Sequence, residues 1–258
     1  MKPIIQITNL KKAYQNGNEK KEVLKGIDLI VSPGQIIGYI GPNGAGKSTT
    51  VKIMCGLIDS FSGEVLVNGT DIKKDPVAIK SQIGYIPESA DIYESITPIE
   101  YFTFIAEMRS LNVTETLDKA KQLLKYFEIE DTAHQRVGSF SKGMKQKVLI
   151  ISALLHDPKI LFMDEPLSGL DANSVIKVKE MITQMAREGK TIFYSSHLMD
   201  IVEKVSNRII LLHDGKIIAD GSFDELKAEN HDESLEKMFA RLTGHHKLNK
   251  FEMNPSEN

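Results

Sequence analysis

The chain has 258 residues and a formal net charge of −3, with 41% hydrophobic and 26% charged residues. This composition is typical of a globular protein with one large domain, and the acidic balance argues against binding nucleic acid through bulk charge. The single cysteine, Cys55, excludes an internal disulfide and favours a reducing compartment, and no apolar run approaches the roughly 20 residues of a membrane-spanning helix.

The first third of the chain predicts short strands. Apolar runs rich in Ile and Val cover residues 4–8, 26–31 and 35–40 and are bounded by Gly, Pro and Asn. Their length and β-branching favour strands over buried helix. A further strand is expected over 62–67, and the Asn-Gly pair that follows it is typical of a tight turn.

The middle of the chain predicts helices. Thr97 followed by Pro98 is typical of a helix start, and Thr114 is the expected cap of a second helix that runs to about residue 128. Because the block of roughly 90–157 interrupts the strand pattern, we predict an inserted helical subdomain there.

The last third alternates strands with helices. Such alternation predicts an α/β fold with a mostly parallel sheet and helices on its faces. Residues 1–244 are expected to form one domain, and the polar segment 245–258 is expected to be disordered. The expected elements are strands at 159–165 and 190–196, helices at 173–189, 197–206 and 234–244, and a hairpin at 207–221.

The segment GPNGAGKS fits the phosphate-loop pattern G-x-x-x-x-G-K-[ST], and it stands between a predicted strand and a predicted helix. In such a loop the backbone N–H groups and the helix N-terminus surround phosphates. Lys47 is expected to contact the β- and γ-phosphates, Ser48 to ligate Mg²⁺, and Thr49 to reach the α-phosphate. The alternative is a chance Gly-rich turn. The expected nucleotide-binding residues are Gly41, Pro42, Asn43, Gly44, Ala45, Gly46, Lys47, Ser48 and Thr49.

An acidic pair, Asp164 and Glu165, ends the apolar run that starts at residue 160. Ligands of parallel sheets lie beyond the carboxyl ends of the strands, so this pair is placed to serve the phosphate loop. Asp164 is expected to hold Mg²⁺ through water, and Glu165 to act as general base toward the attacking water. The alternative is a solvated strand end.

The stretch SFSKGMKQK, residues 139–147, places three lysines after small residues. It could be a nucleic-acid patch, a solvated helix start or half of an anion site. It precedes the acidic pair, which is followed by LSGLD and then by SSH after the next strand. This order resembles that of the ATP-binding subunits of ABC transporters, and the resemblance runs from Tyr14 to about Gly244. It implies a P-loop NTPase core with a mostly parallel sheet, an N-terminal antiparallel β-subdomain and an inserted α-helical subdomain, with ATP and Mg²⁺ as cofactors.

The resemblance also assigns roles to single residues. Tyr14 corresponds to the aromatic residue that stacks on adenine, and His197 to the switch histidine that contacts the γ-phosphate. Ser141 and Gly143 correspond to the signature residues that meet the γ-phosphate held by the opposite subunit. Asp171 corresponds to the residue that reaches across a dimer, although it could also cap a helix. For Tyr14 and His197, ordinary structural roles remain the alternative.

Two positions depart from the family pattern. The signature is usually LSGGQ, whereas residues 140–144 read FSKGM, and this wording resembles a subgroup of exporters that pair with a separate permease. Glu88 stands where the family has a glutamine. Its carboxylate could ligate Mg²⁺, or the residue could face solvent or the permease.

The leading hypothesis is an ATP-hydrolysing subunit that powers transport, in the direction of export, through a separate membrane permease. It implies a second nucleotide-binding subunit, identical or related, a permease, a location on the cytoplasmic face of the membrane, and no direct nucleic-acid partner. The alternatives are a soluble ABC ATPase that acts on ribosomes or nucleic acid, and a kinase that shares only the phosphate loop.

Overall fold

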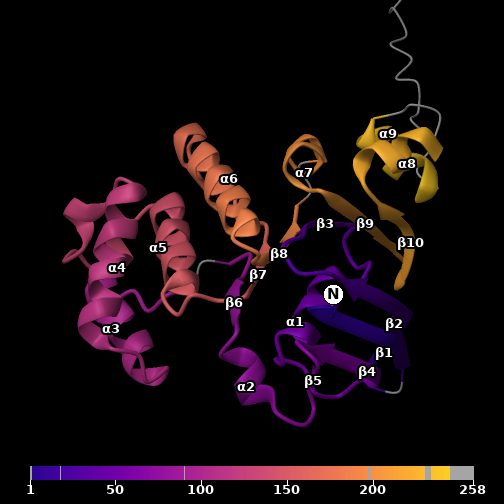
Figure 1. The fold of residues 1–258 in the computed structure, drawn as a ribbon, viewed down its shortest axis with the longest axis horizontal. Coiled ribbons are helices and arrows are strands. Elements are labelled where there is room, and N and C mark those ends of the chain that lie inside the picture. The colour runs from indigo at the N-terminus through magenta and orange to yellow at the C-terminus, as the bar shows by residue number, and fades with distance from the viewer. Residues whose placement is uncertain (1, 18, 90, 197–198, 230–233, 245–258) are drawn as a thin grey trace, which may run out of the picture.

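The computed structural model describes residues 2–17, 19–89, 91–196, 199–229 and 234–244, and these residues form two sheets with helices around them (Figure 1). The first sheet has four antiparallel strands in the order β2-β1-β4-β5, and the second has six strands in the order β10-β9-β3-β8-β7-β6. The strands are β1 (Ile5–Asn16), β2 (Glu19–Val31), β3 (Ile36–Ile40), β4 (Ser62–Val67), β5 (Thr70–Asp71), β6 (Ile83–Ile86), β7 (Ile160–Asp164), β8 (Thr191–Ser195), β9 (Arg208–His213) and β10 (Lys216–Gly221).

The six-stranded sheet is mostly parallel. Strand β3 pairs with β8 and β9, and β7 pairs with β6 and β8, all in parallel, while β10 pairs with β9 antiparallel. The predicted α/β class with an N-terminal antiparallel sheet is confirmed. The predicted hairpin is also confirmed, because Asp214 and Gly215 both have positive φ in the tight turn between β9 and β10.

Alternate residues of the central strands pack into two different layers. In β3, Ile37 and Tyr39 pack on the side of the first helix and the antiparallel sheet, whereas Ile36 and Ile40 pack with the long helices of the opposite face. All five residues of β3 are buried, as expected of a central parallel strand that is covered on both faces.

The helices are α1 (Lys47–Met54), α2 (Pro76–Lys80), α3 (Pro98–Met108), α4 (Val113–Tyr126), α5 (Lys142–Leu154), α6 (Ala172–Arg187), α7 (Met199–Val205), α8 (Phe223–Glu229) and α9 (Leu235–Leu242), with 3₁₀ turns at Glu130–Thr132 and Val137–Ser139. Among the described residues, none of these helices has the length and apolarity that crossing a membrane requires.

Helix starts follow from short polar side chains. Thr97 and Glu100 form a reciprocal capping box at the start of α3, which confirms the predicted start. The prediction of Thr114 as the cap of α4 is wrong. Asn112 takes this role, because its Oδ1 accepts a hydrogen bond from the N–H of Glu115, so α4 begins at Val113.

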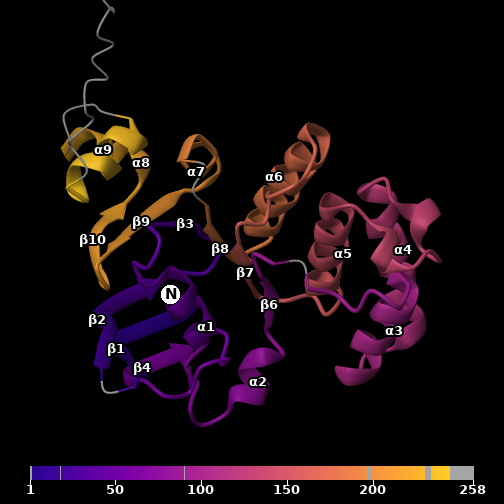
Figure 2. The ribbon, with the colours of Figure 1, turned by 180° about the vertical axis from the view of Figure 1, so that it is seen from behind.

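Helices α3, α4 and α5 lie together at one side of the six-stranded sheet, and α6 lies between them and α7 (Figures 1 and 2). The chain enters this group after β6 and leaves it into β7. Within the group, Lys119 Nζ donates to the carbonyl of Leu154 at 2.7 Å, which joins α4 to the C-terminal end of α5. The group occupies the place where the sequence predicts a helical subdomain.

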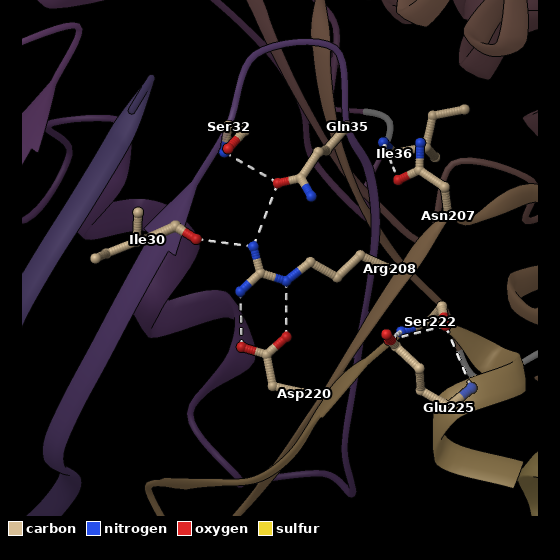
Figure 3. Close-up of polar contacts among 9 residues, drawn as sticks. All are labelled: Ile30, Ser32, Gln35, Ile36, Asn207, Arg208, Asp220, Ser222 and Glu225. Carbon is tan, nitrogen blue, oxygen red and sulfur yellow. Dashed lines mark hydrogen bonds and ion pairs between the residues drawn. The ribbon is translucent and has the colours of Figure 1, made fainter. Parts of the chain in front are cut away.

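A single arginine joins the two sheets (Figure 3). Arg208 of β9 makes a bidentate pair with Asp220 of β10, with both N···O distances 2.7 Å, and also donates to the carbonyl of Ile30 on β2 at 2.7 Å. Gln35 Oε1 accepts from Arg208 and from the N–H of Ser32, which ties in the loop between β2 and β3. The loop that leads into β3 is therefore held from both sheets.

Candidate nucleotide-binding site

The predicted phosphate loop connects the end of β3 to the start of α1, which is the strand–loop–helix context that the motif requires. Glycine is needed at two positions. A Cβ on Gly41 would lie 2.2 Å from the carbonyl oxygen of Leu212, and Gly46, the residue before α1, has φ 109° and faces the side chain of Leu24. The phosphate loop therefore packs closely against β9 at Gly41 and against β2 at Gly46.

Lys47 reaches back over this loop. Its Nζ donates to the carbonyls of Gly41 at 2.6 Å and Pro42 at 3.2 Å. Burial lowers the pKa of Lys47, and the carboxylates of Asp164 and Glu165 offset part of this effect. Two backbone carbonyls thus hold the ammonium over the loop, where it could pair with a bound phosphate.

Ser48 and Asp164 meet across 116 positions of sequence. Ser48 Oγ donates to Asp164 Oδ2 at 3.0 Å, and Ser195 Oγ donates to the other carboxylate oxygen, Oδ1. Asp164 is buried at the carboxyl end of β7. A hydroxyl and a carboxylate that converge at the mouth of a phosphate loop provide the hard oxygen ligands that Mg²⁺ prefers, so these residues fit the ion.

Glu165 follows directly and has φ 47°, a left-handed conformation that is costly for a residue with a side chain. Its N–H donates to the carbonyl of Ser195 at 3.1 Å, and Ser196 Oγ donates to its Oε2 at 3.3 Å. The last residue of the neighbouring strand β8 therefore holds the backbone of Glu165, and the residue after that strand holds its carboxylate. The charge of exposed Glu88, just after β6, adds to those of Asp164 and Glu165 in offsetting part of the lowering of the Lys47 pKa by burial.

A hollow lies over the phosphate loop. Its walls include Tyr14 of β1 and Lys21 and Val23 of β2, besides residues 43–44 and 46–49 of the loop and of α1. Tyr14 is 41% exposed, and its hydroxyl is 3.5 Å from Thr49 Oγ1. Its ring is thus available to a flat ligand that lies beside the loop. Lys21 and Val23 were not predicted, and only the register that pairs Tyr14 with Lys21 could have indicated them.

The signature residues lie elsewhere. Ser141 is the N-cap of α5, where its Oγ accepts from the N–H of Met144 at 3.2 Å. A Cβ on Gly143 would lie 2.5 Å from the carbonyl oxygen of Gly169, so the signature packs against the loop after β7. Neither residue lines the hollow over the phosphate loop.

Asp171 caps α6 and shares this second group. Its carboxylate accepts hydrogen bonds from the N–H of Ser174 at 2.9 Å and from the Ser174 hydroxyl at 2.6 Å. These bonds, more than the nearby Lys147 ammonium, hold the pKa of Asp171 well below its usual value. In the single chain, Asp171 therefore has the helix-capping role that was the alternative prediction. His197 lies outside the described residues.

Comparisons with known proteins show the family of this chain. The model of the family "ABC transporter" matches residues 24–168. The linearmycin resistance ATP-binding protein LnrL of Bacillus subtilis (strain 168) is 36% identical over 86% of this chain and 70% of its own length. The chain belongs to the ABC transporter ATP-binding family. It is an ATP-binding subunit of the kind that these transporters use, and an ATPase.

Two solved structures place this ABC ATPase among cassettes, the nucleotide-binding subunits of the family. An ATP-binding subunit of an ABC transporter has a TM-score of 0.86 at 30% identity and covers 93% of this chain and 99% of its own. A dimeric cassette in a post-hydrolysis state, bound to ADP and Pi, has a TM-score of 0.79 at 25% identity and covers 84% and 98%. Both confirm the P-loop NTPase fold of this ABC ATPase.

Proposed function

We propose that this chain powers the export of a substrate through a separate membrane permease, by ATP-driven closure of two cassettes. The observation that carries the proposal is the separation of two half-sites in one chain. The phosphate loop, Asp164 and Glu165 form one group, whereas Ser141 and Gly143 form another that does not line the nucleotide hollow. A second cassette that turned its signature toward the hollow would complete the site. The dimeric cassette among the solved relatives supports this arrangement.

Each residue near the hollow then has a defined task. The ring of Tyr14 stacks on adenine, and Lys47 binds the β- and γ-phosphates. Ser48 and Asp164 would hold Mg²⁺, with the Glu88 carboxylate as a further proposed ligand, and the ion would supply charge neutralisation for the phosphates. Glu165 takes the proton of the attacking water, and its attachments to the end of β8 and to the residue after it fix its direction. His197, which lies outside the described residues, keeps its predicted role of contacting the γ-phosphate.

The permease docks, in this proposal, on a groove between the core and the helical group. Leu57, Tyr101 and Ile105 line it together with the basic residues Lys80 and Arg109, and none of its described lining residues is acidic. Large apolar side chains are exposed in and just before α3, which supplies part of the groove, with Tyr93 71% exposed and Phe104 50%. Such a surface suits a short amphipathic helix with an acidic residue, presented at the cytoplasmic side of the membrane.

Export is supported by the wording of the signature and by the relative LnrL. The SKGMKQ segment at 141–146 resembles that of exporters with separate permeases. The name of LnrL states resistance to linearmycin, an activity that removal of a compound from the cell would provide. The transported compound itself contacts the permease, so its identity is a property of that partner.

The dimer mechanism is tested by trapping. We expect Glu165→Gln to bind ATP, to hydrolyse it at least about a hundredfold more slowly, since general bases contribute about 10²–10⁴-fold, and to form a stable dimer with ATP and Mg²⁺ in size-exclusion chromatography with light scattering. Adding Ser141→Arg, which puts bulk and charge at the start of α5, should leave binding of a fluorescent ATP analogue unchanged and abolish that dimer. A monomer with ATP in the Glu165→Gln chain, or a dimer that tolerates Ser141→Arg, would contradict the proposal.

A further inference from the structure

A lysine occupies the signature position where the family usually has a glycine, and its ammonium is bound to the loop after β7. Lys142 is the first residue of α5, and its Nζ donates to Ser168 Oγ at 2.7 Å. We propose that Lys142 is a positioning residue. Its bond to Ser168 ties the signature to the loop after β7 of the same subunit, which begins with Glu165. A γ-phosphate that is held by the opposite subunit and contacts this signature would thereby set the position of Glu165. This inference rests on the dimer mechanism proposed above.

The two segments are packed so closely that they must move together. A Cβ on Gly143 would lie 2.5 Å from the carbonyl oxygen of Gly169, and a Cβ on Gly169 would lie 3.1 Å from the Cγ and Cδ of Lys142. Gly169 also has φ 79°, which favours glycine. A second attachment lies one turn further along α5, where Lys147 Nζ is 3.4 Å from the carboxylate of Asp171. A phosphate that pulls on the start of α5 would therefore also move residues 168–171.

The link continues to the catalytic residue. The N–H of Ser168 donates to the carbonyl of Glu165 at 3.1 Å. Two hydrogen bonds thus connect the Lys142 ammonium to the backbone of Glu165, which has φ 47° and is sensitive to any change in its surroundings. The carboxylate of Glu165 is held on its other side by Ser196 Oγ at 3.3 Å. A displacement of residues 168–171 would turn the general base relative to β8.

The position of Lys142 at the start of α5 explains why its ammonium is hydrogen-bonded. A cation at the start of a helix is opposed by the helix dipole, and the hydroxyl of Ser168 offsets this cost by accepting a hydrogen bond from the ammonium. When a γ-phosphate approaches the N-terminus of α5, the same ammonium adds to the attraction. The charge therefore favours the closed dimer, while the bond carries the position of the signature to Glu165.

The test compares Lys142→Met and Ser168→Ala, singly and together, in steady-state ATP hydrolysis by the full chain. Either change should lower kcat about tenfold, the effect of losing one hydrogen bond from a charged donor, with KM for ATP and analogue binding unchanged. The double variant should be no slower than Lys142→Met alone, because Lys142→Met already removes the bond that Ser168→Ala removes. Lys142→Arg keeps a donor and should restore most of kcat. Lys145→Met, a change in the same helix that removes a surface pair with Glu94, is the matched control and should keep wild-type kcat.

Trapping the dimer distinguishes the role of Lys142 from the dimer mechanism itself. In the Glu165→Gln background, Lys142→Met should still form the ATP-dependent dimer, which shows that the signature still docks. If that dimer forms and both single variants keep wild-type kcat, or if their losses multiply in the double variant, the inference about Lys142 is overturned and the dimer mechanism stands. If the Glu165→Gln chain stays monomeric with ATP, the dimer mechanism fails and this inference fails with it.

Discussion

His156 has an unusual environment for an ionisable side chain. It follows α5 by two residues and lies in the wall of the groove proposed for the permease, where its Nε2 is 2.9 Å from the carbonyl of Ile83. Burial, followed by the charge of Arg109, lowers the pKa of His156 from 6.5 to about 4, although Asp157 opposes the shift. The neutral ring is therefore the form that the fold accepts.

This depressed pKa gives stability a defined pH dependence. Between pH 6.5 and about 4, the unfolded chain takes up a proton at His156 that the folded chain refuses, so folding free energy is lost as the pH falls through this window. The His156→Gln variant has no such group. We expect its stability to fall less than that of the wild type between pH 7 and pH 5, by about 1–2 kcal/mol after allowance for solvent screening, in urea unfolding. Parallel losses in the two proteins would show that His156 titrates normally.

At the scale of elements, the Arg208 cluster shown in Figure 3 joins β2, β9 and β10. Its side chain is about one-fifth exposed, and its removal would take away the bidentate partner of Asp220 and a donor to the carbonyl of Ile30. We expect Arg208→Met to lower the free energy of unfolding by about 2–3 kcal/mol, measured by urea denaturation.

The matched control for this cluster is Lys121→Met, which removes an exposed pair with Asp118 within α4. That change should leave the denaturation midpoint unchanged, because exposed pairs contribute little. Equal effects of the two substitutions would mean that Arg208 stabilises only as a surface charge.

The sequence predicted those elements whose formation depends on residues that are close together in the chain. The capping box at Thr97 and the Asp-Gly hairpin depend on residues within a few positions of one another. The cap of α4 was misplaced by two residues because Asn112 and Thr114 are both short polar side chains, and the helical pattern alone does not choose between them. Other contacts join segments that are distant in the chain, so no local pattern predicts them. Examples are the contact of Arg208 with Ile30 and that of Lys142 with Ser168.

The candidate site divides in the same way. A contiguous motif indicated Lys47 and Ser48, and a strand end indicated Asp164, so their meeting was predictable once a parallel sheet was expected. The contributions of Lys21 and Val23 to the hollow depend on how β2 pairs with β1, which a single sequence does not specify. The left-handed backbone of Glu165 depends on its contact with Ser195 of β8, and the sequence alone could not predict it either.

At the scale of the whole molecule, the docking groove makes a prediction about assembly. From detergent extracts of its native cells, the tagged chain should bring down a membrane protein with several helices. Leu57, 54% exposed at the groove, and Ile30, 59% exposed on β2, offer a matched pair of apolar surface residues. We expect Leu57→Glu to lose the membrane protein, since it puts negative charge into a basic, apolar docking surface, while ATP hydrolysis by the isolated subunit persists.

Ile30→Glu should retain the membrane protein, because it introduces the same charge away from the groove. Loss of the partner in both variants would place the docking surface elsewhere. Recovery of ribosomal proteins in place of a membrane protein would favour the soluble class of ABC ATPases.

The phosphate loop is shaped by a part of the chain that comes long after it. The carbonyl of Leu212 fills the space that a Cβ on Gly41 would need, and the N–H of Gly215 donates to the carbonyl of Ala45 at 3.1 Å. The family match ends at residue 168, well before this turn. A truncated gene product that stopped there would carry every letter of the phosphate-loop motif and would be counted as an ATPase by any motif search. It would nevertheless lack the backbone of Leu212 and Gly215 against which the loop is formed, so we expect the motif alone to be insufficient for nucleotide binding.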